Sequence, residues 1–247
     1  MRGITNRQLL MLVATLVVII GVTTIMKLDP EHDRSHSSTG PAGLMNENDL
    51  ATSIQHEPPR NLPRILFLGD SLFAGYGLAA HQSAPALIQQ KINHASLHYV
   101  VINAGRAGDT SAQALQRLPH YFDRGIPIQV LVIGLGSNDI INGVSLDSLE
   151  SNLKSIIQEA RQNNPDMKVF LFQMRMFPPY VQDERLLNEY AGLYPKVAEE
   201  SGAILLPFFL EDVAGRPELN QADGLHPTTR GTRIVANHMW ESLRGRL

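Results

Sequence analysis

The sequence predicts an α/β fold in which a doubly wound, five-stranded parallel sheet lies between two layers of helices. Short apolar runs and amphipathic helical segments alternate five times between residue 62 and the C-terminus. The apolar runs are continuous and do not alternate with polar residues, as expected for parallel strands that are covered on both faces. Short connections between these runs and the helical segments also favour a parallel sheet.

Each strand is predicted from a short apolar run, of which RILFLG and QVLVIG are the clearest. In chain order the predicted strands cover residues 64–69, 99–103, 129–134, 168–174 and 203–206. A helical segment follows every strand. The predicted helices cover residues 83–93, 109 to about 121, 147–163, 185–200 and 228–243. The helix at 147–163 has the strongest period, with Leu149, Leu153 and Ile156 on one side, and Asp109, Thr110 or Ser111 can cap the helix before it.

Composition limits the classes of function. The 247 residues are 43% hydrophobic, enough for one sizeable core. The net charge of −3 comes without a basic stripe, which argues against a nucleic-acid partner. The chain has no cysteine, which excludes disulfides, thiolate metal sites, a cysteine nucleophile and a lipidated cysteine.

The N-terminal segment predicts a membrane anchor. Residues 9–26 form an uncharged, mostly apolar run that would span roughly 27 Å as a helix. Arg2 and Arg7 precede the run, which favours a single-pass inner-membrane protein with its N-terminus in the cytoplasm and its main domain in the periplasm. The alternatives are a cleaved signal peptide, although no A-x-A-like site follows, and a buried core helix, although the run has no polar face. We therefore divide the chain into an anchor (1–27), a polar flexible linker (28–60) and a globular domain (61–247).

Candidate catalytic residues follow four of the five predicted strands. Ser71 comes after the first strand, Gly108 after the second, Asn138 after the third, and Asp223 and His226 after the fifth. Because the carboxyl ends of parallel strands meet at one edge of the sheet, we expect these residues to share one crevice.

These residue types suit acyl transfer. A serine hydroxyl becomes a nucleophile when a base takes its proton, and His226 can act as that base while Asp223 orients the imidazole. The attacked carbonyl becomes an oxyanion that needs hydrogen-bond donors. The backbone N–H groups of Ser71 and Gly108 and the side-chain amide of Asn138 can donate. Ser71 alone could be a helix cap, and Asn138 a loop former, but together these residues predict a catalytic site.

Four sequence blocks resemble the SGNH (GDSL) hydrolase family, with a closer similarity to its bacterial thioesterase I, lysophospholipase and arylesterase branch. The blocks are Gly69-Asp70-Ser71-Leu72, Gly108, Gly136-Ser137-Asn138-Asp139 and Asp223-Gly224-Leu225-His226-Pro227. The resemblance covers about residues 62–243. It implies a flavodoxin-like fold, a Ser71–His226–Asp223 triad, and oxyanion donors at Ser71, Gly108 and Asn138. It also implies hydrolysis of esters and thioesters without a metal or a cofactor. Ser137 stands where the branch commonly has glycine.

Other readings remain open at this point. Phe177 and Tyr180, after the fourth strand, are candidates for a mobile wall of the acyl pocket, against a plain Pro-rich loop. His94 and His98 are four residues apart, but they straddle a predicted helix end without a third ligand and are read as surface residues. The expected substrates are aryl or alkyl esters, acyl thioesters and lysophospholipids. The alternatives are a carbohydrate O-deacetylase of the cell envelope and a non-catalytic envelope module, which the presence of both Ser71 and His226 disfavours.

Overall fold

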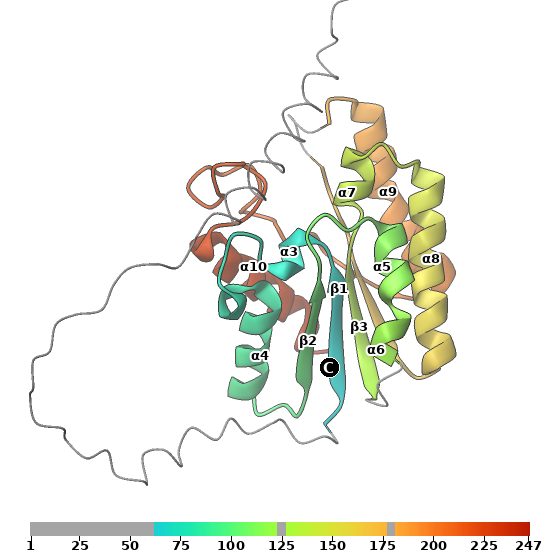
Figure 1. The fold of residues 1–247 in the computed structure, drawn as a ribbon, viewed down its shortest axis with the longest axis vertical. Helices are drawn as coiled ribbons and strands as arrows, with labels where there is room; N and C mark the ends of the chain where they lie inside the picture. The colour runs from blue at the N-terminus through green and yellow to red at the C-terminus, as the bar shows by residue number, and fades with distance from the viewer. Residues whose placement is uncertain (1–61, 123–126, 177–180) are drawn as a thin grey trace, which may run out of the picture. The chain divides into compact units, whose positions relative to one another are not determined.

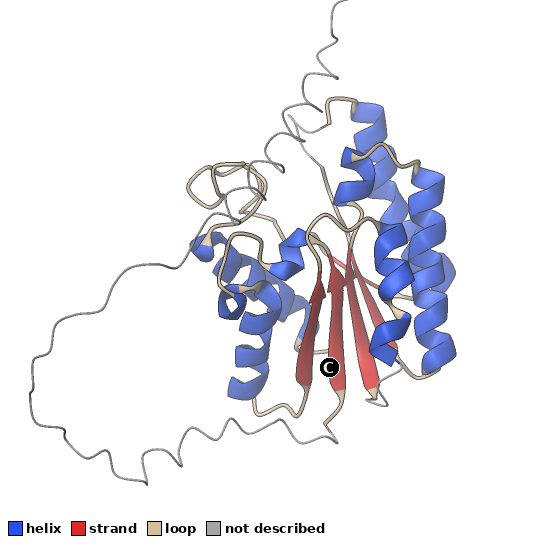
Figure 2. Ribbon diagram, in the orientation of Figure 1, coloured by secondary structure: helices blue, strands red, loops and turns tan. Residues whose placement is uncertain are grey.

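The computed structural model describes residues 62–122, 127–176 and 181–247. The strands of these residues form one parallel sheet in the order β2-β1-β3-β4-β5, with all arrows pointing the same way (Figure 2). The strands are β1 (Arg64–Gly69), β2 (Val100–Gly105), β3 (Ile128–Gly134), β4 (Lys168–Phe172) and β5 (Ile204–Leu206). The predicted five-stranded parallel sheet is confirmed.

Helices cover both faces of the sheet (Figure 1). The helices are α3 (Ser71–Ala74), the 3-10 helix η2 (Ala80–Gln82), α4 (Ala84–His94), α5 (Ser111–Arg117), α6 (Pro119–Phe122), α7 (Ser137–Ile141), α8 (Leu146–Asn163), α9 (Glu184–Ser201) and α10 (Thr229–Leu243). One layer contains α4 and α10, which pack against each other, and the other contains α5, α8 and α9. The chain runs from β1 outward to β2 and then returns to β3, so the direction of winding reverses between β1 and β3. Sheets of this kind place their ligand sites at the carboxyl ends of the strands beside such a reversal.

Aromatic packing under the first helix fixes the end of β1. All six residues of β1 are buried. The ring of Phe73 in α3 lies 5.6 Å from that of Phe209 and 5.5 Å from that of Phe67, between centroids. Gly105 lets α3 approach the end of β2, because a Cβ there would lie 2.2 Å from the backbone nitrogen of Ala74. The short helix that begins with Ser71 is therefore held against the ends of two strands.

Element boundaries differ from the sequence prediction at a few places. The helix expected to reach residue 121 breaks into α5 and α6, because Pro119 has no N–H to continue the helical hydrogen bonds. The fourth strand ends at Phe172, two residues early. The short helices α3, η2 and α7 were not predicted as elements, since segments of three to five residues show no helical period.

The predicted anchor at 9–26 and linker at 28–60 lie outside the described residues. Within 62–122, 127–176 and 181–247, none of the helices combines the length and the apolar character that crossing a bilayer requires.

Candidate active site

Ser71 lies at a sharp corner between β1 and α3. The strand ends at Gly69, Asp70 caps the helix, and Ser71 is its first residue. Oδ1 of Asp70 accepts a hydrogen bond of 3.0 Å from the backbone N–H of Leu72, which fixes the turn. Because it directly follows the end of β1, Ser71 lies at the carboxyl edge of the sheet, where 9% of its surface is exposed.

A hydrogen-bonded chain joins Ser71, His226 and Asp223. Nε2 of His226 lies 2.8 Å from Oγ of Ser71, and Nδ1 of His226 lies 2.7 Å from Oδ2 of Asp223. The structure thus brings together the three residues that were predicted to form a triad. With Nδ1 protonated and donating to the carboxylate, Nε2 is left to accept the serine proton, as general-base activation requires.

The carboxylate of Asp223 is prepared to hold the imidazole. Desolvation alone would raise its pKa, but hydrogen bonds from the backbone and side chain of His226 and from the backbone of Leu225 outweigh it and leave the pKa below its usual value. The backbone N–H groups of Leu225 and His226 donate to Oδ1 at 2.9 and 3.0 Å. Asp223 is therefore ionised at neutral pH, the state that stabilises an imidazolium.

Backbone pairing shapes the loop that carries Asp223 and His226. Asn220 and Pro227 form an isolated antiparallel bridge, and the N–H of Gln221 donates to the carbonyl of His226 at 2.7 Å. The side chain of Gln221 also donates to the carbonyl of Tyr76 at 2.7 Å, which ties this loop to the segment after α3. The two segments that carry the triad are thus fastened to each other.

Tyr76 is a site residue that the sequence analysis did not single out. Its ring centroid lies 4.6 Å from that of His226, and the residue is 52% exposed. The ring therefore packs against the imidazole while about half of Tyr76 stays exposed. The available signal was an aromatic residue five positions after the nucleophile, which is too common a pattern to stand out.

The predicted oxyanion donors lie beside the nucleophile corner. Gly108 has a φ of +84° with open space where a Cβ would project, so its backbone takes a conformation that other residues rarely adopt. Nδ2 of Asn138 donates to the carbonyl oxygen of Asp109 at 2.9 Å and reaches Oδ2 of Asp70 only at 3.5 Å. A primary amide has two N–H groups, so the second N–H of Asn138 has only this long contact and can serve another acceptor.

Two buried carboxyl groups support these loops. Burial, together with the nearby charges of Asp139 and Asp109, raises the pKa of Asp70 to about 7 against the lowering effect of the hydrogen bond from Leu72. Asp139 is fully buried, where it accepts hydrogen bonds from the backbone N–H and the hydroxyl group of Ser111 at 2.9 and 2.5 Å. Asp139 therefore joins α7 to α5 and has a structural role.

A cavity of about 640 Å³ opens beside the triad. Leu72, Met176 and Leu210 give it apolar surface, Arg175 adds a cation, and Asp223 lies at its border. Phe177 and Tyr180, the predicted pocket residues, lie outside the described part of the chain; Met176, immediately before them, lines this cavity. The size and the apolar lining suit an acyl chain.

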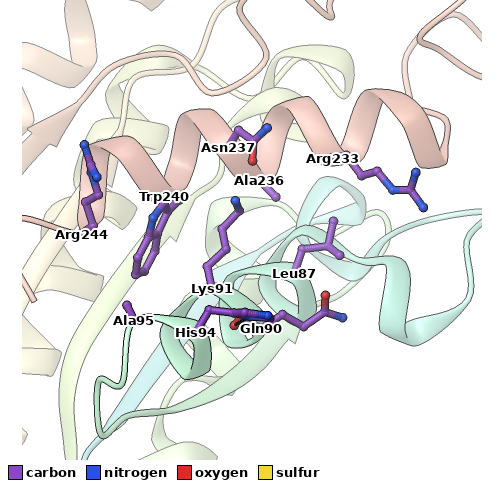
Figure 3. A pocket seen from close by; sticks show the side chains of 10 residues that line it. All are labelled: Leu87, Gln90, Lys91, His94, Ala95, Arg233, Ala236, Asn237, Trp240 and Arg244. Atoms are coloured by element: carbon purple, nitrogen blue, oxygen red, sulfur yellow. Dashed lines mark hydrogen bonds between the residues drawn. The ribbon is translucent and has the colours of Figure 1, made fainter.

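A second cavity, of about 700 Å³, lies between α4 and α10 (Figure 3). Lys91, Arg233, Arg244 and the single tryptophan, Trp240, line it together with His94. None of the described residues that line this cavity has a hydroxyl or carboxyl group, so it offers no serine-type nucleophile. In the described ranges, no group of three or more His, Asp or Glu side chains is placed to hold a metal ion.

Fold and site together define a serine hydrolase of the α/β class. The model of the GDSL-like Lipase/Acylhydrolase family matches residues 67–234, and the chain belongs to that family. The resemblance drawn from the four sequence blocks is thus confirmed.

Named relatives agree with this assignment. The chain is 36% identical over 180 residues to Esterase TesA of Pseudomonas aeruginosa, covering 73% of this chain and 87% of that one. It is 37% identical over 180 residues to Thioesterase 1/protease 1/lysophospholipase L1 of Escherichia coli K12, covering 73% and 83% of the two chains. Among solved structures, the psychrotrophic esterase EstA from Pseudoalteromonas, inhibited by monoethylphosphonate, superposes with a TM-score of 0.68 at 29% identity, covering 74% of this chain and 97% of that one.

Proposed function

We propose that this protein hydrolyses carboxylic esters and thioesters through an acyl-serine intermediate on Ser71. The observation that carries the proposal is the continuous chain of hydrogen bonds from Asp223 through His226 to Oγ of Ser71, at 2.7 and 2.8 Å. Relatives named esterase, thioesterase and lysophospholipase support the same reaction class.

The reaction proceeds in two half-reactions. Nε2 of His226 takes the hydroxyl proton while Oγ of Ser71 bonds to the carbonyl carbon, and the carbonyl oxygen becomes an oxyanion. The N–H groups of Ser71 and Gly108 and Nδ2 of Asn138 stabilise that charge. The tetrahedral intermediate then expels the alcohol or thiol, which receives the proton from His226. In the second half-reaction, His226 activates a water molecule, which releases the carboxylic acid and restores Ser71.

The substrates follow from the cavity beside the triad. Its apolar side chains, Leu72, Met176 and Leu210, suit the acyl portion of aryl or alkyl esters, acyl thioesters and lysophospholipids. The relative from Escherichia coli, named both thioesterase and lysophospholipase, supports acyl groups larger than acetyl.

Hydrolysis of p-nitrophenyl esters of increasing chain length tests the proposal. The full chain, purified in detergent, should hydrolyse them, and Ser71→Ala should lose activity by at least about 10⁴-fold. A fluorophosphonate should label the wild type at Ser71. Ser242→Ala, which removes a hydroxyl group bound to the carbonyl of His238 on α10, is the matched control and should stay active. Activity confined to acetyl groups on sugars would indicate a carbohydrate O-deacetylase, and an unlabelled, inactive wild type would contradict the proposal.

We further propose that residues 1–27 anchor the protein in the inner membrane, that residues 28–60 form a flexible linker, and that residues 61–247 act in the periplasm. The support is the apolar run at 9–26 and the preceding Arg2 and Arg7. The protein should resist carbonate extraction, and protease should digest it in spheroplasts but not in intact cells. Val18→Arg should weaken membrane retention, because a central arginine opposes insertion by about 3 kcal/mol. A shortened, extractable chain would indicate a cleaved signal peptide.

A further inference from the structure

We infer that Arg117 and Asp109 form a buried clamp that positions the oxyanion donors, an assignment that rests on the proposed ester hydrolysis. Arg117 is the last residue of α5, and its guanidinium group contacts four acceptors. They are Oδ2 of Asp109 at 2.5 Å, the carbonyl oxygens of Ala104 and Gly69 at 2.7 and 3.1 Å, and the hydroxyl group of Tyr121 at 2.9 Å. One side chain thus joins the ends of β1 and β2 to the loop that contains Gly108.

The pair is almost withdrawn from solvent, since 12% of the Arg117 side chain and 3% of the Asp109 side chain are exposed. Burying two charges carries a desolvation penalty, and the attraction between the charges is often no larger than this penalty. A buried ion pair is therefore weak evidence for stability. What the pair supplies is geometry, because a planar guanidinium group bound to several fixed acceptors cannot shift without breaking hydrogen bonds.

The backbone of Asp109 connects the clamp to two of the donors. Gly108 precedes Asp109, so the carboxylate bound by Arg117 belongs to the residue next to the donating amide. The carbonyl oxygen of Asp109 accepts the 2.9 Å hydrogen bond from Nδ2 of Asn138, which orients that amide. A displacement of Asp109 therefore moves both the Gly108 N–H and the Asn138 side chain.

The same arginine also connects to the third donor. Gly69, whose carbonyl oxygen accepts from Arg117, is two residues before Ser71. Arg117 thus fixes the loop with Gly108 and Asn138 relative to the corner with Ser71. Oxyanion donors act only when they lie about 2.7–3.1 Å from the oxygen of the tetrahedral intermediate. Because the charge develops only in the transition state, a misplaced donor lowers kcat and leaves KM nearly unchanged.

The test is steady-state hydrolysis of a p-nitrophenyl ester by the full chain, with kcat divided by the concentration of active sites titrated with a fluorophosphonate. Arg117→Gln and Asp109→Asn should each lower kcat per active site by roughly 10- to 100-fold, with KM within about two-fold of wild type. Arg117→Lys should retain an intermediate kcat, because an ammonium group keeps the charge but cannot bind the acceptors as a planar fork. The double variant should lose no more than the worse single variant, since both changes break one clamp.

Arg161→Gln is the matched control. Arg161 also donates to two backbone carbonyls, those of Ser201 and Gly202, but between α8 and the end of α9. The control should lower the unfolding temperature while leaving kcat per active site unchanged, as a purely structural arginine would. If Arg117→Gln fails to fold, kcat per active site in Arg117→Lys and Asp109→Asn tests the positioning role instead.

Three results would overturn the inference: kcat per active site within about two-fold of wild type in the Arg117 and Asp109 variants, additive losses in the double variant, or an equal loss in Arg161→Gln. An inactive wild type, in contrast, would contradict the proposed function itself.

Discussion

Nε2 of His226 lies 2.8 Å from Oγ of Ser71, although 155 positions separate the two residues in the sequence. Their strands are not neighbours, because β3 and β4 lie between β1 and β5. The long connection from β5 to α10 crosses back over the carboxyl edge of the sheet, and α10 then packs against α4, which lies against β2. This crossing delivers the base to the nucleophile, so the triad depends on the doubly wound topology.

Loss of Asp223 should be milder than loss of His226. Both residues belong to the series of hydrogen bonds that ends on Ser71, but only His226 transfers the proton. Asp223 orients the imidazole ring and stabilises its protonated form. We expect the loss of kcat in Asp223→Ala to be roughly 10- to 100-fold smaller than the loss in His226→Ala. Members of the same triad contribute unequally in this way in other hydrolases. Rates of p-nitrophenyl ester hydrolysis per mole of folded protein measure the difference, because a variant without the base would not react with a fluorophosphonate. Glu218→Ala, an exposed acid in the same connection, is the control; equal losses at Asp223 and His226 would contradict these roles.

Replacement of Asn138 should act on turnover. Asn138→Ala removes the only side-chain amide among the proposed oxyanion donors and should lower kcat roughly 10²- to 10³-fold with little change in KM. Asn142→Ala, at the other end of α7, removes an amide of the same kind and should leave kcat within about two-fold. A rise in KM at constant kcat would instead assign Asn138 to ground-state binding.

Gly108 and Gly143 separate backbone strain from catalysis. Both have positive φ values, +84° and +71°, and both have open space where a Cβ would project. Gly108→Ala and Gly143→Ala should each lower the free energy of unfolding by about 1 kcal/mol, because an alanine is strained in this conformation. Only Gly108→Ala should also lower kcat, since relief of the strain rotates a proposed oxyanion donor. Urea unfolding and rates of ester hydrolysis on both variants check this; unchanged kcat in Gly108→Ala would remove Gly108 from the donors.

The sequence was sufficient to predict the five strands of the sheet and the catalytic residues that meet at its carboxyl edge. Continuous apolar runs identified all five strands within two residues at each end, because burial on both faces leaves few polar interruptions. The proximity of Ser71 and His226 could be predicted, because parallel strands place their carboxyl ends at one edge of the sheet. The crossing of the chain from β5 back to β1 has no such signature in composition or periodicity.

The supporting residues of the site were not predictable in the same way. Arg117 follows an amphipathic helical pattern and looks like an ordinary cation near a helix C-terminus. Its contacts with Gly69, Ala104 and Asp109 arise only after β1 and β2 pair. Asp139 stands out in the sequence only as the last residue of its block, but its carboxylate is buried against Ser111, a partner 28 positions away. Long-range polar pairs of this kind depend on the final fold, and no local pattern reports them.

Asp70 makes stability depend on pH in an unusual direction for a carboxylic acid. Burial raises its pKa from 3.8 to about 7, so the folded protein holds the proton more tightly than the unfolded chain does. The folded state therefore binds more protons between pH 4 and pH 7, and the contribution of Asp70 to stability, complete below about pH 4, is lost as the pH rises through 7.

Asp70→Asn should expose this linkage. The asparagine cannot ionise, and its carbonyl oxygen can still accept the hydrogen bond from Leu72 that Oδ1 of Asp70 accepts. Relative to wild type, the variant should gain stability steadily between pH 4 and pH 7 and then keep a constant advantage. The gain should be on the order of a few kcal/mol, because each unit of pKa shift corresponds to about 1.4 kcal/mol. Urea unfolding of both proteins from pH 4 to pH 9 measures the difference in their free energies of unfolding. The value at pH 4 is the internal control, because any difference there comes from packing alone. A difference that stays constant across this range would show that the carboxyl group ionises in the folded and unfolded states alike.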